Sequence, residues 1–415
     1  MPHFPAAILS ETQSLAGTII FCASYLVFAL GKFPGLKIDR TGASIIGAIA
    51  MVVFGVVSAQ DALRFVDFRT VVLLFAMMLV VGGLRLSGFF EWNAELVLQR
   101  LKPELMLPAL IFTSGILSAF FVNDIVCLVM VPFVLALVRK LKFPPLPFLL
   151  AVATASNIGS VATITGNPQN ILIGSLSRLS YRAFLFHLGP VAAIGLVLDW
   201  LILRWIFARE LKQPEPAPGA ISLPPLDLSN LLKPVLVATG VVLSFLVGVP
   251  PALAAAAGAA ILLISRSRDP RKLYAEIDWG LLVFFVGLFI IVGGAENAGL
   301  VERLLRFAER WNLHNVAVFT AVTALFSNVV SNVPAVMLLK SLVAEFPDPD
   351  RTWMLLATAS TLAGNLTITG SVANIIVIET AKPDVQISFW DYFRVGLPIT
   401  AVTVVVGALW LAYVM

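Results

Sequence analysis

Two stretches of the chain place amides, hydroxyls, Gly and Pro inside an otherwise apolar sequence. The first, ATASNIGSVATITGNPQN, covers residues 153–170, and the second, ATASTLAGNLTITGSVAN, covers residues 357–374. They align without a gap at an offset of 204 residues and share ATAS, TITG and a final Asn. Gly and Pro break a helix, and the freed peptide groups can then bind a ligand. The two stretches therefore predict two related binding segments.

A second pair of polar motifs precedes these stretches. AFFVND at residues 119–124 resembles ALFSNV at residues 324–329. Each motif lies between apolar arms of about 15 residues, which is shorter than the roughly 20 residues that a membrane-spanning helix needs. We therefore expect a re-entrant hairpin in each half, with its polar tip at membrane depth.

The four motifs together define the candidate substrate- or ion-binding residues. The first half supplies Asn123, Asp124, Ser156, Asn157, Thr163, Thr165, Gly166, Asn167 and Asn170. The second half supplies Ser327, Asn328, Ser331, Asn332, Ser360, Thr361, Asn365, Thr367, Thr369, Gly370 and Asn374. The alternative interpretation is structural, because Ser, Thr, Asn and Gly also hold helices together in membrane bundles.

Asp124 is the candidate with the most specific chemistry. An acid within a membrane segment is costly and indicates function by default, here proton uptake or cation binding. The alternative is an acid that reaches a water-filled vestibule. Asp199 also lies in an apolar run, has no counterpart in the second half, and is interpreted as an interface or structural residue. We expect Na⁺, if it binds, near Asn123, Asp124 and Asn332, and no other metal.

The composition indicates that most side chains lie in a lipid environment rather than in water. The chain has 415 residues, of which 59% are hydrophobic and only 13% are charged, whereas soluble domains carry about 25% charged residues. Apolar runs of spanning length recur along the chain. We expect an all-α polytopic membrane protein in the cell (inner) membrane. The modest net charge of +4 indicates basic cytoplasmic loops rather than a nucleic-acid partner.

The repeat predicts two inverted halves of five spans each, or about ten spans plus two hairpins. The first half covers residues 1–208 and the second covers 233–415, separated by a proline-rich linker at 209–232. Five is an odd number, so the second half is inverted relative to the first. The expected hairpins are 106–138 and 315–345, and the expected broken helices are 146–176 and 352–378. The excess of Lys and Arg on one side predicts a cytoplasmic linker, with both termini outside.

The motifs closely resemble the arsenite permease branch of the ion transporter superfamily. The residues that carry the resemblance are FVNDIVCLVMVPFVLAL followed by SNIGSVATITGNPQN, together with SGFFEW, FSNVVSNVPAVMLL and FWDYFRVG. The run NIGS…GNPQN is most similar to the silicon-efflux transporters. Citrate carriers and sodium-coupled dicarboxylate symporters belong to the same superfamily. The resemblance implies a scaffold domain and a moving transport domain that works as an elevator, often in a homodimer.

The resemblance also carries over one motif to the hairpin tips. The Ser-Asn-Thr tip of the dicarboxylate symporters corresponds to residues 122–124 and to a segment near residues 331–333. Asp124 replaces a hydroxyl, which favours proton coupling over a neutral sodium cage. The second tip lacks an acid, so the two cation positions are not expected to be equivalent.

The preferred functional hypothesis is proton-coupled efflux of a small hydroxylated metalloid, arsenite or silicic acid. The breaks contain no Lys or Arg, which a doubly charged anion would favour. The first alternative is a sodium-coupled symporter for a carboxylate or inorganic anion, because half-helix dipoles bind anions without a cationic side chain. The second is a sodium/proton antiporter. We expect no cofactor beyond the coupling ion, H⁺ or Na⁺. The sequence contains no nucleophile–base or metal-binding motif of the kinds that would predict an enzyme.

Overall fold

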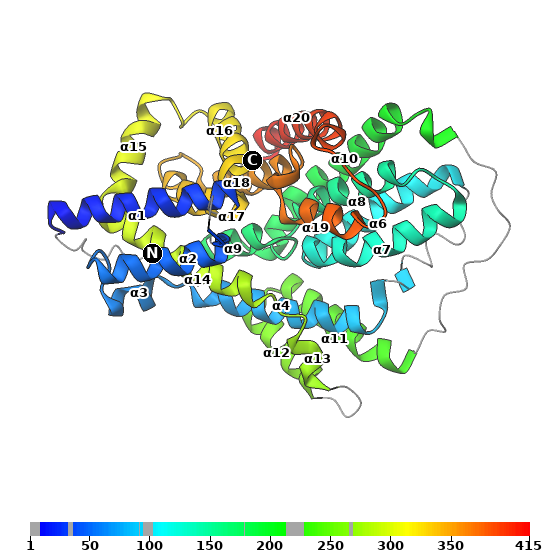
Figure 1. Ribbon diagram of the computed structural model, residues 1–415, viewed down its shortest axis with the longest axis horizontal. Helices are drawn as coiled ribbons and strands as arrows, with labels where there is room; N and C mark the ends of the chain where they lie inside the picture. Colours follow the sequence, from blue (N-terminus) through cyan, green and yellow to red (C-terminus); the bar gives the residue numbers. More distant parts are fainter. Residues whose placement is uncertain are drawn as a thin grey trace.

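The fold consists of helices that repeat in the same order in the two halves of the chain (Figure 1). The computed structural model describes residues 9–31, 36–90, 92–93, 103–177, 179–212, 228–264 and 269–415. These residues form 19 α-helices and three short 3-10 helices, without a strand among them. The all-α fold predicted from the composition is confirmed.

The described residues of the first half form α1, α2, the short α3 and α4 before the hairpin region, and α6 to α10 within and after it. Their bounds are α1 Glu11–Leu30, α2 Arg40–Val53, α3 Ala59–Phe65, α4 Phe68–Leu86, η1 Pro103–Leu105, α6 Met106–Phe120, α7 Asn123–Leu141, α8 Pro145–Ser160, α9 Pro168–Leu176, α10 Tyr181–Ile206 and η2 Glu210–Lys212.

The second half repeats this order. Its bounds are α11 Leu228–Leu246, α12 Pro251–Leu263, α13 Pro270–Tyr274, α14 Trp279–Asn297, α15 Leu300–Arg310, α16 Val316–Val330, α17 Asn332–Val343, α18 Pro349–Ala363, η3 Ile368–Gly370, α19 Val372–Ala381 and α20 Phe389–Val414. Of the linker predicted at 209–232, residues 213–227 lie outside the described residues.

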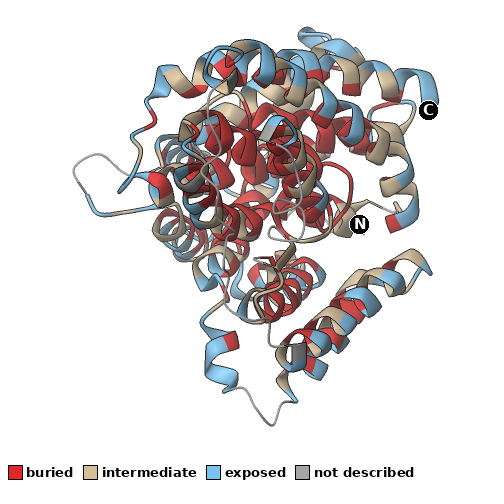
Figure 2. Cartoon of the chain, turned by 90° about the vertical axis from the view of Figure 1, so that its right-hand side faces the viewer, coloured by how far each residue is buried: buried red, intermediate tan, exposed pale blue. Residues whose placement is uncertain are grey.

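Within the described part of the chain, six helices are long and apolar enough to cross a membrane, namely α1, α4, α10, α11, α14 and α20. Their outward faces are apolar as well as their inward faces. On α1, for example, Leu15, Ile19 and Leu26 are each more than half exposed. Figure 2 shows the buried residues gathered in the interior of the bundle, with exposed and intermediate residues on the outer helix faces. Exposed apolar faces of this extent suit lipid rather than water.

The two halves pack against each other reciprocally. Helix α2 packs on α14, and its counterpart α12 packs on α4. In the same way α7 packs on α19 while α17 packs on α9, and α10 packs on α20. Such exchanged pairs are what a two-fold relation between similar units produces. The repeat seen in the sequence is therefore also a repeat in the packing.

The helices fall into two groups, which meet where α4 packs on α9, α1 on α16, α11 on α10 and α14 on α17. The first group contains α1–α4 and α11–α14, and the second contains α6–α10 and α16–α20. Between them, the Tyr25 hydroxyl donates to the carbonyl of Pro334 at 3.0 Å. Lys340 on α17 forms an ion pair with Glu296 on α14 at 3.0 Å. The Ser175 hydroxyl on α9 also donates to the Asp67 carboxylate at the start of α4. These polar contacts have to break if one group slides past the other.

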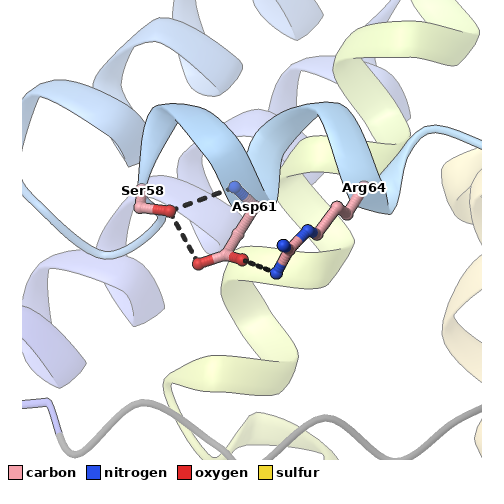
Figure 3. A network of polar contacts seen from close by, with 3 residues as sticks. All are labelled: Ser58, Asp61 and Arg64. Carbon is pink, nitrogen blue, oxygen red and sulfur yellow. Dashed lines mark hydrogen bonds and ion pairs between the residues drawn. The ribbon is translucent and has the colours of Figure 1, made fainter.

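The short helix α3 has a cap that explains where it begins. The Ser58 hydroxyl accepts from the backbone N–H of Asp61 at 3.0 Å and donates to the Asp61 carboxylate at 2.6 Å (Figure 3). Arg64 then pairs with Asp61 at 3.4 Å across one turn. Both charged side chains are about half exposed, so this pair contributes at most about 1 kcal/mol to stability.

The core of the second group depends on a close approach of α6 and α8. Gly159 on α8 lies against Gly115 on α6, and a Cβ added to Gly159 would lie 2.0 Å from the carbonyl oxygen of Gly115. Backbone on both sides leaves no flexible side chain that could move aside. Two glycines therefore set the distance between the helix of the first hairpin and the first broken helix.

We predict that Gly159→Ala destabilises the protein, because the new methyl group must push α6 and α8 apart. Overpacking of this kind costs about 1–3 kcal/mol. The measurement is thermal unfolding of the purified protein in detergent. Gly240→Ala on α11 is the matched control, because no atom lies within 4 Å of its added Cβ and Ala favours a helix over Gly. Equal melting temperatures for the two variants would contradict the prediction.

Candidate functional site

Each hairpin tip and each helix break leaves backbone that is not helical in the interior of the bundle. In the first half, α6 ends at Phe120 and α7 begins at Asn123, while α8 ends at Ser160 and α9 begins at Pro168. The tip and the break meet directly, because the N–H of Asn123 donates to the carbonyl of Gly166 at 2.9 Å. A Cβ at Gly166 would lie 2.2 Å from the carbonyl oxygen of Ser160, so only Gly fits there.

One asparagine in each half ties the two ends of its broken helix together. Nδ2 of Asn170 donates to the carbonyls 10 and 7 residues earlier, both at 3.0 Å. Nδ2 of Asn374 donates to the carbonyls 10 and 7 residues earlier, at 2.7 and 3.0 Å. The identical geometry explains why this asparagine occurs at the same place in both motifs. It satisfies two carbonyls that the break removes from the helix.

The first polar cluster is a buried set of carboxamides and one hydroxyl that all bond to Asn157. We call this set the carboxamide ring. Nδ2 of Asn157 donates to Oδ1 of Asn365 and to Oδ1 of Asn374, each at 2.9 Å. Its Oδ1 accepts from Nδ2 of Asn123 and from the Ser371 hydroxyl, also at 2.9 Å each. All five side chains are at most 3% exposed. This ring joins the first hairpin tip and α8 to the second broken helix.

The second polar cluster is centred on Thr361, the residue of α18 that corresponds to the centre of the first ring. The Thr361 hydroxyl accepts from Nδ2 of Asn167 at 3.3 Å and from Nε2 of Gln169 at 3.1 Å. With its amide oriented to satisfy its neighbours, Asn332 accepts from Gln169 at 3.2 Å and donates to the carbonyls of Ser360 and Gly370 at 3.1 Å. This cluster joins the second hairpin tip and α18 to the first broken helix.

Helix N-termini at these clusters leave peptide N–H groups available. The α9 terminus is capped, because Oδ1 of Asn167 accepts from the N–H of Asn170 at 2.8 Å. By contrast, α7, α17 and α19 have no side-chain cap on their first turns. At α19 the cap residue, Ser371, turns its hydroxyl to the carboxamide ring instead. Uncapped N–H groups at a helix N-terminus favour an oxyanion or a polar oxygen as ligand.

The remaining candidates brace the clusters. Cys127 Sγ contacts the Ser156 hydroxyl at 3.0 Å. In the second half, the Ser327 hydroxyl lies 2.6 Å from the Asn332 amide and donates to the carbonyl of Ser360 at 3.0 Å. The others bond mainly to backbone or to neighbouring hydroxyls, namely Thr163 to the carbonyl of Ala119, Thr165 to the Tyr181 hydroxyl at 3.0 Å, and Thr367 to Oδ1 of Asn328 at 3.2 Å.

The structure places two predicted residues outside the clusters. Thr369 is exposed, and its hydroxyl reaches only Thr367 at 3.5 Å. Asn328 lies in the last turn of α16 and donates to the carbonyl of Ala363 at 2.8 Å. The residue that corresponds to Asn123 in position is Asn332, because these two residues begin α7 and α17. Ser331 precedes it with φ 77°, a conformation that favours Gly.

Asp124 lies one residue beyond the first hairpin tip and is half-buried. Among the described residues its carboxylate has no hydrogen-bond or ion-pair partner. Another acid, Asp278 at the start of α14, lies within electrostatic range. Asp278 itself caps α14 by accepting from the N–H of Leu281 at 2.9 Å. The two acids belong to different helix groups.

Sequence reasoning did not select Gln169 and Ser371, which complete the two clusters. Gln169 is buried and bridges Thr361 and Asn332. Ser371 stands at the position equivalent to Asn167, the residue after Gly in each motif. That equivalence was the available signal for Ser371. Gln169 has Ala373 at the equivalent position, so the repeat could not identify it.

We predict that Asn157→Ala lowers the melting temperature, because it leaves four buried polar partners without their central amide. A buried polar group that loses its partner costs about 1–3 kcal/mol. Thermal unfolding in detergent measures the effect. Thr369→Ala is the control, since its hydroxyl is exposed and makes one long contact. A melting temperature unchanged in Asn157→Ala would show that the ring contributes nothing to stability.

Two known transporters are similar to this chain over nearly its whole length. The silicon efflux transporter LSI3 of Oryza sativa subsp. japonica is 31% identical over 97% of this chain and 98% of its own length. The putative transporter arsB of Dictyostelium discoideum is 26% identical over 94% of this chain and 90% of its own. Both relatives are transporters by name and match nearly the full length of the chain.

A solved structure shares the fold. The YdaH transporter of Alcanivorax borkumensis, described as having an unusual topology, is 14% identical, with a TM-score of 0.59 over 96% of this chain and 97% of its own. The family model for citrate transporters, CitMHS, matches residues 25–350. The chain is therefore an integral multi-pass membrane protein that belongs to the CitMHS citrate transporter family, within the ion transporter superfamily.

Proposed function

We propose that the chain is a secondary active transporter that exports a small hydroxylated metalloid, arsenite or silicic acid, in exchange for protons. The observation that carries this proposal is the chemistry of the two clusters. Their hydrogen-bonding side chains are carboxamides and hydroxyls, and no Lys, Arg or His of the described residues bonds to them. Uncapped N–H groups at α7, α17 and α19 add further donors.

An uncharged polyhydroxyl molecule fits this set of groups. A carboxamide offers both a donor and an acceptor, and each hydroxyl of the substrate needs both. A multiply charged anion is usually bound through Arg or Lys, often with bidentate geometry. The full-length similarity to a relative named as a silicon efflux transporter supports the same substrate class.

Asp124 is the group we assign to proton coupling. It lies beside Asn123, which is part of the first ring, so substrate and proton would bind next to each other. Its carboxylate has no partner within the described part of the chain and lies within electrostatic range of Asp278. A second acid nearby favours the protonated form of one of the pair. Release of that proton on the cytoplasmic side would accompany substrate binding.

The two helix groups support movement of the site as a unit. Both clusters belong entirely to the group of α6–α10 and α16–α20. The bonds from Tyr25 to Pro334 and from Lys340 to Glu296 would break and re-form as this group slides. We extend the proposal to an elevator movement in a homodimer of the inner membrane, with the linker cytoplasmic and both termini outside.

A second candidate function is sodium-coupled symport of citrate or another carboxylate. The family model that matches the chain is named for citrate transporters. The uncapped N-termini of α7, α17 and α19 could hold carboxylate groups without a cationic side chain. Na⁺ would then bind near Asn123, Asp124 and Asn332. A sodium/proton antiporter that uses Asp124 is the third reading.

Transport by proteoliposomes distinguishes these candidates. We expect an imposed proton gradient to drive arsenite or silicic acid out of the compartment that corresponds to the cytoplasm, at a rate at least tenfold above protein-free liposomes. Sodium should have no effect. The same vesicles are tested with citrate and succinate under sodium and proton gradients. Sodium-dependent citrate or succinate uptake that ignores the proton gradient would overturn the metalloid proposal in favour of the second candidate.

We predict that Asp124→Asn abolishes proton-driven transport, because an amide cannot take up and release the proton. Exchange of labelled substrate across the membrane should persist, since the clusters stay intact. Asp61→Asn is the matched control, because its carboxylate bonds to Ser58 and Arg64 on α3, outside the group of helices that holds both clusters. Proton-driven efflux at the wild-type rate in Asp124→Asn would remove Asp124 from this role.

A further inference from the structure

Asp199 is a buried acid that the proposed mechanism does not use. It lies two turns before the C-terminal end of α10, is fully buried, and neither carboxylate oxygen has a hydrogen-bond partner among the described residues. An ionised carboxylate without a partner costs several kcal/mol at such a place. The corresponding position of the second half, at the offset that relates Pro190 to Pro398, is Gly407. Packing of the repeat therefore does not require an acid here.

Among the described residues, no positively charged side chain pairs with Asp199. Helices α6, α8, α11, α18 and α20 pack on α10, and α6 and α8 carry no ionisable side chain. Tyr392 on α20 lies within electrostatic range of Asp199. On α10 itself, Arg204 lies over the Trp200 ring. The other ionisable groups of the packed helices lie within two turns of a helix end, namely Lys233, Asp350, Arg351, Asp391, Arg394 and Tyr413.

Two neighbours connect Asp199 to the first ring. The side chain faces Thr154 on α8. The Thr154 hydroxyl already donates to the carbonyl of Leu150 at 2.9 Å, so toward Asp199 it can only accept. The carbonyl of Thr154 accepts from Nδ2 of Asn365 at 3.3 Å. One residue thus separates the carboxyl group from a carboxamide that binds Asn157.

The second connection passes through Tyr392. This side chain is 1% exposed, and its hydroxyl makes no hydrogen bond within the described residues. It lies beside both Asp199 and Asn374. Asn374 is another member of the ring and accepts from Asn157 at 2.9 Å. Both routes from the buried acid therefore end at the same amide.

We propose that Asp199 is a second proton-binding group of the transporter, behind the first ring and linked to it through Thr154 and Tyr392. The proposal rests on the proposed proton coupling and extends it to a second site. Asp199 holds a proton while the members of the ring bond to Asn157. A ligand that draws Asn365 or Asn374 out of the ring changes the groups that face the carboxyl, and the proton then leaves to water.

Proton release on substrate binding tests this role. Arsenite or silicic acid is added to detergent-purified protein in weak buffer, and released protons are counted with an indicator dye. We expect Asp199→Asn to release fewer protons than wild type, and Asp124→Asn/Asp199→Asn to release none. In proteoliposomes, Asp199→Asn should slow proton-driven efflux at least tenfold while labelled-substrate exchange continues. Unchanged proton release and efflux would overturn the proposal. Asp61→Asn is again the control.

Two further measurements keep the test decisive. If Asp199→Asn does not fold, infrared difference spectra of the wild type and of Asp199→Glu decide, because a protonated carboxyl band must shift between them and disappear on substrate binding. A band that persists with substrate bound would mean a fixed proton and a structural role. If a proton gradient drives neither arsenite nor silicic acid through the wild type, the proposed function fails. The same proton-release assay is then made with citrate, and it decides whether Asp199 binds the coupled proton.

Discussion

The constraint on which this structure depends is that interrupted helices in a membrane protein must find partners for their freed peptide groups. Lipid supplies none, so the breaks must be satisfied by the protein or by what it binds. Asn170 and Asn374 satisfy two carbonyls each with the same geometry. The N-termini of α7, α17 and α19 keep uncapped N–H groups. These N–H groups are the ones that the proposed function assigns to substrate binding.

The duplication accounts for the arrangement of the two clusters. The positions at which the two halves differ account for their different side chains. Each cluster combines a hairpin tip and the first part of a broken helix from one half with the second part from the other half. The centres differ, since Asn157 is a carboxamide and Thr361 a hydroxyl. Asp124 and Asp199, which have no hydrogen-bond partner among the described residues, have no acidic counterpart at the equivalent positions of the second half. A symmetric framework thus carries groups that differ between its halves.

The polar interior also explains why the surrounding packing is tight. Gly159 lets α8 lie directly on α6, and Asn157 on α8 bonds to Asn123 at the hairpin tip. Buried polar networks are stable only when nearly all of their members are satisfied. A ligand can replace ring contacts without leaving polar atoms unpaired, provided that its hydroxyls take the same positions. This requirement links substrate size and hydrogen-bonding capacity to the conformation of the ring.

The sequence by itself determined the membrane class, the two related halves and the segments that break, because these follow from composition and from local residue patterns. It also identified most members of the clusters. Only the tertiary structure decided which residues meet: that Asn157 binds Asn365 and Asn374, that Gln169 and Ser371 complete the clusters, and that Thr369 points outward. It also decided between two alignments of the second tip: the repeat of AFFVND pairs Asn123 with Asn328, the family motif pairs it with Asn332, and it is Asn332 that begins its helix as Asn123 does. The physical reason is that contacts between distant segments depend on helix crossing and on where each hairpin turns, which no local pattern encodes.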